Sequence, residues 1–278
     1  MMTKLKILNI AAFCLLVVLS SCGQQKEYMF NNQLPGFDFH SFDSTPMRSF
    51  AEAVDLEDTL RMEEIARSKR INLNYPDPKF GQSILSLAII NNKYAAVVKL
   101  LHLGADINYR SLHHDHSTPF LNLCEHISVV QNSLAIMKLL LEHGADVNAI
   151  QADEATGALG DKYIVKTTAL EYLISYGTLE HVKLLVNSGA RLDTYPATGS
   201  KSLLYQAVVL SPRLDVLKYL LIDKKIEVPQ YIDIHDEGEP SERKITLREE
   251  ILKRLEVKDA RQIQIENEIL NYLQTKGL

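Results

Sequence analysis

The sequence predicts an all-α solenoid, in which short helix pairs stack along one direction. Three observations support this fold class. Nearly the same segment occurs three times, as VVKLLHLGADIN, IMKLLLEHGADVN and HVKLLVNSGARLD at residues 97–108, 136–148 and 181–193. A Ser or Thr opens an apolar segment upstream of each copy, and such starts recur mostly every 34 or 35 residues. Each copy also carries two adjacent leucines followed by a Gly, as expected where an apolar helix ends.

The predicted repeats begin at five positions and together span residues 49–232. These starts are Ser49, Ser83, Thr118, Thr168 and Ser202. One step is longer, at 50 residues, because it carries an insertion at 149–167. We expect this insertion to project as a mobile loop, with Tyr163 in a short returning strand.

Each recurring residue has a physical reason. A Ser or Thr at the start can cap the first helix, because its oxygen accepts a hydrogen bond from a free backbone N–H. Gly104, Gly144 and Gly189 can end the second helices with a positive φ. The leucine pairs should lie on the buried side of those helices. A single helix pair cannot bury its apolar face alone, so stacked pairs must bury each other.

These motifs resemble the ankyrin repeat. Thr118 and Pro119 match the start of that repeat, and the segments 104–108 and 144–148 match its G-A-D-V-N element. The resemblance covers roughly residues 49–230 and departs where Arg70 and Asp223 stand in place of Gly. It implies a solenoid of about five helix-turn-helix repeats that binds proteins through its finger tips and the groove of its first helices.

The N-terminus is predicted to be a signal peptide over residues 1–21. Two lysines precede an apolar run at 7–19 that is too short to span a bilayer. The following Leu-Ser-Ser-Cys, which ends at Cys22, resembles the lipobox of a bacterial lipoprotein. Cleavage before Cys22 would leave an acylated residue, with palmitate among its lipids. A plain secretory signal with an incidental Cys, or an uncleaved anchor, are the alternatives.

The two flanks of the repeats have separate predictions. Residues 22–48 form a lipidated tether and an N-terminal cap, in which Phe37, Phe39 and Phe42 cover the open end of the first repeat. Residues 233–278 form a helical C-terminal cap or a degenerate sixth repeat, after a polar break at 235–243. Two apolar stripes support its helices, namely Leu247, Ile251, Leu252 and Leu255, and Ile265, Ile269 and Leu273.

Composition and motifs argue against an enzyme and against a nucleic-acid partner. The formal charge of −5 does not favour binding to phosphates. The cluster from His113 to His116 has ligand-type side chains, but we interpret it as an exposed polar turn. Cys124 is expected to be a buried, inert thiol. We predict no catalytic residue, no metal site and no cofactor.

The predicted function is protein binding by a membrane-anchored monomer in the bacterial cell envelope. Gly23 after the lipidated Cys favours the outer membrane, facing the periplasm, by resemblance to enterobacterial lipoproteins. Tyr and Arg are common at the energetic centres of interfaces. The finger-tip candidates are Tyr75, Phe80, Tyr109, Arg110, Tyr163 and Tyr195, and the groove candidates are Tyr94, Glu171, Tyr176 and Tyr205.

The identity of the partner stays open between three hypotheses. The chain is a scaffold that binds an envelope or periplasmic protein, or an immunity protein that neutralises a secreted bacterial toxin. A structural envelope protein without a specific partner is the third. The sequence does not separate the first two, because both need the same fold in the same compartment.

Overall fold

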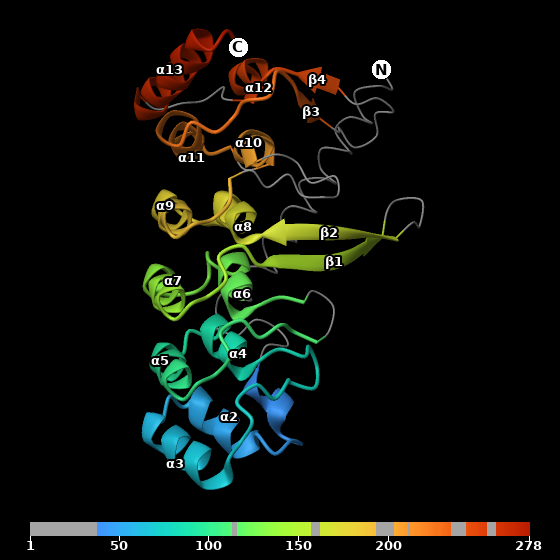
Figure 1. The fold of residues 1–278 in the computed structure, drawn as a ribbon, viewed down its shortest axis with the longest axis vertical. Helices are drawn as coiled ribbons and strands as arrows, with labels where there is room; N and C mark the ends of the chain where they lie inside the picture. Colours follow the sequence, from blue (N-terminus) through green and yellow to red (C-terminus); the bar gives the residue numbers. More distant parts are fainter. Residues whose placement is uncertain are drawn as a thin grey trace, which may run out of the picture.

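The computed structural model describes residues 38–112, 116–156, 162–192, 203–210, 212–234, 243–254 and 260–278. Within them, pairs of short helices stack one on another to form an elongated molecule (Figure 1). The first helices of the pairs form one layer, and the second helices form another layer beside it. The structure is therefore mostly helical, as the sequence predicts.

The helix pairs follow one another in chain order. They are α2 (Arg48–Asp55) with α3 (Thr59–Lys69), α4 (Ile84–Ile90) with α5 (Tyr94–His102), α6 (Pro119–Glu125) with α7 (Ser133–Glu142), and α8 (Ala169–Tyr176) with α9 (Leu179–Asn187). The next pair is less regular. There, α10 (Leu203–Tyr205) runs into the π-helix η2 (Gln206–Leu210), and α11 (Leu214–Lys218) runs into the π-helix η3 (Tyr219–Asp223).

Hydroxyl side chains begin three of the first helices, as predicted. Ser83, Thr118 and Thr168 each accept a hydrogen bond from the backbone N–H three residues further on. Each bond satisfies a donor that the start of a helix leaves without an intrahelical partner. Ser202, the fifth predicted start, lies outside the described residues.

Left-handed residues end the second helices, which is also as predicted. Gly104, Gly144 and Gly189 have φ values of +90°, +86° and +97°. Arg70, which stands in place of Gly after α3, adopts a φ of +46° all the same. The repeat geometry therefore imposes the same helix ending on a residue that has a Cβ.

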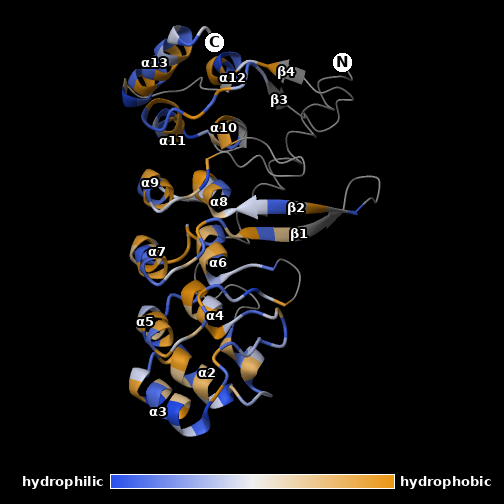
Figure 2. Ribbon diagram, in the orientation of Figure 1, coloured by the Kyte–Doolittle hydropathy of each residue, from blue (hydrophilic) through white to orange (hydrophobic). Residues whose placement is uncertain are grey.

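The apolar core lies between the two helix layers and between successive pairs. Hydrophobic residues recur in each helix pair in Figure 2, and every residue of α4 is buried. Leu140 and Leu185 are fully buried, whereas Leu139 and Leu184 before them are only partly buried. One leucine of each of these two pairs therefore points into the core.

Two β-hairpins interrupt the helical pattern, so the all-α prediction is incomplete. Strands β1 (Ile150–Thr156) and β2 (Lys162–Thr168) pair antiparallel, with Ile150 opposite Thr168 and Thr156 opposite Lys162. The insertion was expected to be a loop with a strand only near Tyr163. Strands β3 (Ile232–Ile234) and β4 (Arg243–Ile245) form a second hairpin at the predicted polar break.

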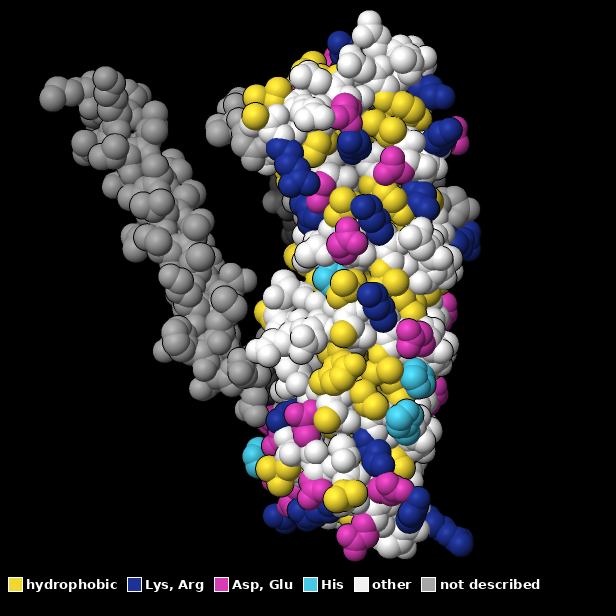
Figure 3. Space-filling view, turned by 90° about the vertical axis from the view of Figure 1, so that its left-hand side faces the viewer, with side chains coloured by type: hydrophobic (Ala, Val, Ile, Leu, Met, Phe, Trp, Pro, Cys, Tyr) yellow, Lys and Arg dark blue, Asp and Glu magenta, His cyan; other side chains and the backbone are white. Residues whose placement is uncertain are grey.

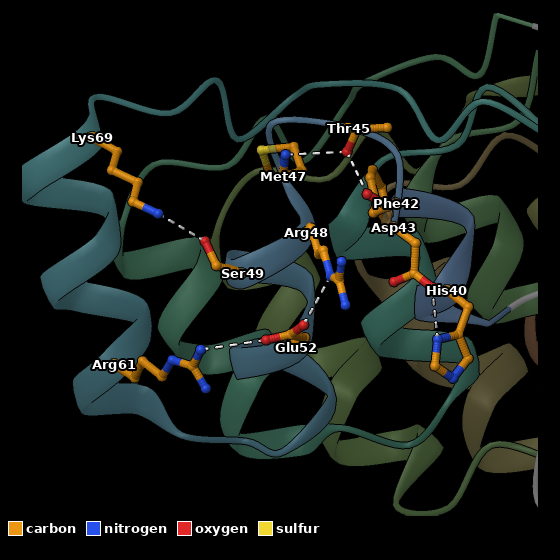
Figure 4. A network of polar contacts seen from close by, with 10 residues as sticks. All are labelled: His40, Phe42, Asp43, Thr45, Met47, Arg48, Ser49, Glu52, Arg61 and Lys69. Carbon is orange, nitrogen blue, oxygen red and sulfur yellow. Dashed lines mark hydrogen bonds and ion pairs between the residues drawn. The ribbon is translucent and has the colours of Figure 1, made fainter.

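A short 3₁₀ helix precedes the first helix pair, and a polar network joins the two helices of that pair. The helix η1 (Phe39–Phe42) buries Phe39 and Phe42 and packs against α2, while Phe37 lies outside the described residues. Figure 4 shows the network, in which Arg48 and Arg61 bind the carboxylate of Glu52.

Ser49 was predicted to cap α2, and this prediction is wrong. The helix already begins at Arg48, and its N-cap residue Met47 makes no side-chain capping bond. The Ser49 hydroxyl accepts a hydrogen bond from Lys69 of α3 instead (Figure 4).

The last helices, α12 (Leu247–Arg254) and α13 (Ala260–Thr275), form a further pair at the end of the stack (Figure 1). The predicted stripes are mostly buried, but Leu252 is 52% exposed, so its assignment to the buried face is wrong. Leu255 lies outside the described residues. Among the helices that the structure describes, none has the length and apolar character needed to cross a membrane.

Candidate protein-binding surface

On one side of the stack, the segments between helix pairs protrude beyond the first helices. We call this the finger side and define it by residues 71–82, 104–112, 144–156, 162–168 and 189–192. Figure 1 shows β1 and β2 extending outward on this side, away from both helix layers. A surface of this kind consists of turns, which a rigid helical scaffold holds in place.

Asparagine side chains connect each finger to the next. Asn74, Asn108 and Asn148 each accept a hydrogen bond from a backbone N–H of the following finger. These donors are Asp106 at 2.9 Å, Asp146 at 2.8 Å and Arg191 at 2.9 Å. Asn108 and Asn148 also donate, to the carbonyls of Gly144 and Gly189. We call this set of bonds the asparagine ladder; it fixes the spacing and orientation of the fingers.

A buried aspartate shapes the first finger. Asp77 is 1% exposed, and its carboxylate accepts backbone hydrogen bonds from Lys79, Phe80 and Gln82 at 2.7–3.0 Å. Lys79 lies with its ammonium 4.8 Å from the centroid of the Phe80 ring. Sequence reasoning did not single out Asp77, although an Asp before Pro-Lys-Phe-Gly is a turn signal.

The second finger carries Tyr109 and Arg110, and both are held by backbone carbonyls. The Tyr109 hydroxyl donates to the carbonyl of Gly81, at 3.3 Å. Burial, and then the nearby charge of Asp77, raise the pKa of this hydroxyl. The Arg110 guanidinium is exposed and donates to the carbonyl of Ile150 at 3.1 Å. Arg110 therefore connects the second finger to the base of the β1–β2 hairpin.

The hairpin presents apolar side chains on one of its faces. Ile150 and Ile164 are 43% and 49% exposed. Ile150 lies opposite Thr168 in the register, and Ile164 shares the face of Thr168 because side chains alternate along a strand. At the other face, Gln151 is buried and accepts a hydrogen bond from Ser117 at 3.2 Å. The hairpin base is thus packed on the array, while its isoleucines contact solvent.

Known proteins share this repeat pattern. The family model described as Ankyrin repeats (3 copies) matches residues 126–231. Over these residues the chain is similar to the ankyrin-repeat family. Such repeats imply a protein–protein interaction module, and the resemblance found in the sequence is confirmed over these residues.

Two kinds of curated relative match part of the chain. It is 34% identical over 119 residues to human Ankyrin repeat and SOCS box protein 6, which is 43% of this chain and 26% of that protein. It is 30% identical over 154 residues to Interferon antagonist OPG039 of Monkeypox virus, which is 55% of this chain and 45% of that protein. The chain spans less than half the length of these curated relatives.

The predicted finger residues have different surroundings. Tyr75 is partly buried against the core and Phe80 is partly buried, whereas Arg110 is exposed. Tyr163 lies in β2, but its side chain is outside the described part, as are Tyr195 and Cys22. The structure therefore places Tyr75, Phe80, Tyr109 and Arg110 on neighbouring fingers, while the side chains of Tyr163 and Tyr195 lie outside the described residues.

The predicted groove residues do not form one group. Tyr94 begins a second helix, α5, and not a first helix. Tyr176 is 57% exposed at the end of α8 and stacks on Tyr172, with ring centroids 6.5 Å apart. Tyr205 lies in α10, and its side chain is not described.

Glu171 differs from its prediction as a contact residue. It is 4% exposed, and its carboxylate accepts hydrogen bonds from the backbone N–H and the hydroxyl of Thr168. Thr168 in turn accepts from the backbone of Glu171, which completes a capping box at the start of α8. The T-x-x-E spacing is the signal that would have identified this role.

One Ser–His pair resembles part of a nucleophilic site, but its hydrogen bonds oppose that use. The Ser133 hydroxyl lies 3.2 Å from Nε2 of His181. However, Nδ1 of His181 accepts the backbone N–H of Thr178, so the neutral ring carries its proton on Nε2. This is the wrong tautomer for a general base that takes a proton from Ser133. The pair instead joins α7 to α9.

Cys124 is buried, as the sequence predicts, whereas most of the histidine cluster lies outside the described residues. Cys124 is fully buried, and burial strongly raises the pKa of its thiol. His116 is exposed, while His113, His114 and Asp115 lie outside the described residues. Within the described ranges, no group of three or more His, Cys, Asp or Glu side chains could hold a metal ion.

Proposed function

We propose that this chain binds another protein through its finger side, while lipid on Cys22 holds it at the bacterial envelope. The observation that supports the binding surface best is the asparagine ladder. It joins successive fingers by hydrogen bonds of 2.8–3.2 Å. A surface that is fixed before binding loses less conformational entropy when a partner docks, so more of the contact energy contributes to affinity.

The side chains on this surface suit a protein partner. Arg110 is exposed at the second finger, and Ile150 and Ile164 are exposed on the adjoining hairpin. Arg and large apolar side chains are typical of the central parts of protein interfaces. We infer that the partner contributes an apolar patch flanked by acidic or carbonyl oxygens.

The binding proposal can be tested by site-specific photo-crosslinking in the native cells. A photoreactive amino acid at position 110 or 164 should form an adduct with one partner of defined mass. Positions Lys138 and Glu142, which are exposed on the second helix α7, are the matched controls and should give no such adduct. Equal adducts from both sets, or adducts from the controls alone, would contradict the proposal.

The anchoring proposal rests on the lipobox-like segment and needs its own experiment. Cys22→Ser should release the chain from the membrane fraction, because a lipidated residue provides lasting anchorage through its acyl chains. The wild-type chain should incorporate labelled palmitate, and the variant should not. Palmitate labelling and membrane association that persist in Cys22→Ser would contradict this part without affecting the binding surface.

A further inference from the structure

Two histidines lie side by side on the face formed by the second helices. Figure 3 views this face and shows two neighbouring histidine side chains beside an apolar patch. The ring centroids of His102 and His143 are 6.4 Å apart, and the ring planes are inclined by 46°. His102 belongs to the last turn of α5, and His143 is the C-cap residue of α7. Consecutive repeats therefore each contribute one imidazole.

The ring separation is close to that needed for shared metal binding. A metal–nitrogen bond of about 2.0–2.1 Å puts two imidazole centroids on one ion about 5–6 Å apart. The observed 6.4 Å exceeds this only slightly. Both side chains are exposed, so small rotations about their side-chain torsions can close the remaining gap.

The hydrogen bond made by Nδ1 of His143 leaves Nε2 of the ring able to bind a metal ion. Nδ1 of His143 lies 2.8 Å from the carbonyl oxygen of Leu139. Because a carbonyl only accepts, Nδ1 carries the proton and Nε2 of the neutral ring keeps a lone pair. Backbone carbonyls orient metal-binding histidines in this way in known sites. Across the described ranges, the His102 ring has no hydrogen-bond partner, so its lone pair is available too.

The charges around the pair allow a cation to bind. Lys99 lies one turn before His102 on α5, but its ammonium is bound by Glu63 at 2.6 Å. Lys99 and Arg67 together lower the pKa of the Glu63 carboxyl, which keeps that counter-charge ionised. Glu142 directly precedes His143 and is exposed, so it adds negative charge beside the site.

We propose that His102 and His143 jointly bind one divalent transition-metal ion of the imidazole-preferring class, such as Ni²⁺, Cu²⁺ or Zn²⁺. Water completes the coordination, since no third His, Cys, Asp or Glu joins the pair among the described residues. The bound ion connects α5 to α7 on the face away from the fingers. This proposal is independent of the proposed partner surface.

The test is a calorimetric titration of the full chain, purified in detergent, with NiCl₂ as the probe. The His113–His116 segment is the competing site, so His113→Ala/His114→Ala is the matched control variant. We expect one saturable Ni²⁺ per chain. His102→Ala and His143→Ala should each weaken its affinity at least tenfold, whereas the control variant should keep it.

A second measurement separates metal binding from folding. Ni²⁺ should raise the thermal unfolding midpoint of the wild type and of the control variant, because it binds only the folded pair. It should not raise that of His102→Ala or His143→Ala, whose circular dichroism without metal should match the wild type. Three results would overturn the proposal: no saturable binding, loss of binding in the control variant, or an effect of only one of the two single substitutions.

Discussion

The asparagine ladder makes a quantitative prediction at Asn148. Its side chain donates to the carbonyl of Gly189 at 3.2 Å and accepts from the backbone of Arg191 at 2.9 Å. Asn148→Ala removes both bonds between two fingers. Each neutral hydrogen bond contributes about 0.5–1.5 kcal/mol to stability. The Asn148 side chain is only half-buried, so water can hydrogen-bond to the backbone groups that lose it. For the two bonds together we expect a loss of about 1–2 kcal/mol of unfolding free energy.

The assay is urea unfolding of the full chain, followed by circular dichroism. Asn148→Ala should lower the urea concentration at the unfolding midpoint. The slope of the unfolding free energy against urea concentration should stay the same, which indicates that stability changes while the surface exposed on unfolding does not. Asn72→Ala is the matched control, because the side-chain oxygen of Asn72 accepts a hydrogen bond from the backbone N–H of Asn74 within its own finger. Equal losses in the two variants would refute the view that the ladder couples neighbouring fingers.

Three further predictions concern helix ends and pH. Arg70→Gly should raise the unfolding free energy by about 0.5–1 kcal/mol, since the left-handed φ of +46° strains any residue with a Cβ; a loss of stability in urea would contradict it. Gly177→Ala should destabilise the chain, because its added Cβ would lie 2.8 Å from the backbone carbonyl oxygen of Leu173; a melting temperature equal to that of the wild type would be evidence against this packing. Burial lowers the pKa of His181 below the ordinary 6.5, so the unfolded chain takes up the proton more readily. Stability should therefore be fully present above pH 6.5 and fall as the pH drops through the folded-state pKa. His181→Gln should be less pH-dependent in that window, and an unchanged pH profile would contradict this assignment.

Local signals in the sequence predicted the elements that depend on one or two residues. The caps at Ser83, Thr118 and Thr168, and the positive φ of the three helix-ending glycines, follow from side-chain chemistry and from the absence of a Cβ. The cap predicted at Ser49 is wrong, because α2 begins one residue earlier and has no side-chain cap. Arg70 adopts the same left-handed φ although a residue with a Cβ disfavours it, so here the repeat geometry decides the backbone conformation.

Features that depend on distant partners were not predictable in this way. Strand β1 has the sequence IQADEAT, whose Asp, Glu and Ala disfavour a strand. It becomes one by pairing with β2. The position of Arg110 depends on a carbonyl 40 residues away, at Ile150. Likewise, the His102–His143 pair forms only when two repeats stack.

The most direct test of the central claim is hydrogen–deuterium exchange of the full chain, with and without the partner captured by crosslinking. We predict that the partner slows exchange in the finger turns at 75–82 and 105–112 and in the hairpin strands β1 and β2. Exchange in the second helices α5, α7 and α9 should stay unchanged. Protection confined to those helices would contradict the claim that the finger side binds the partner.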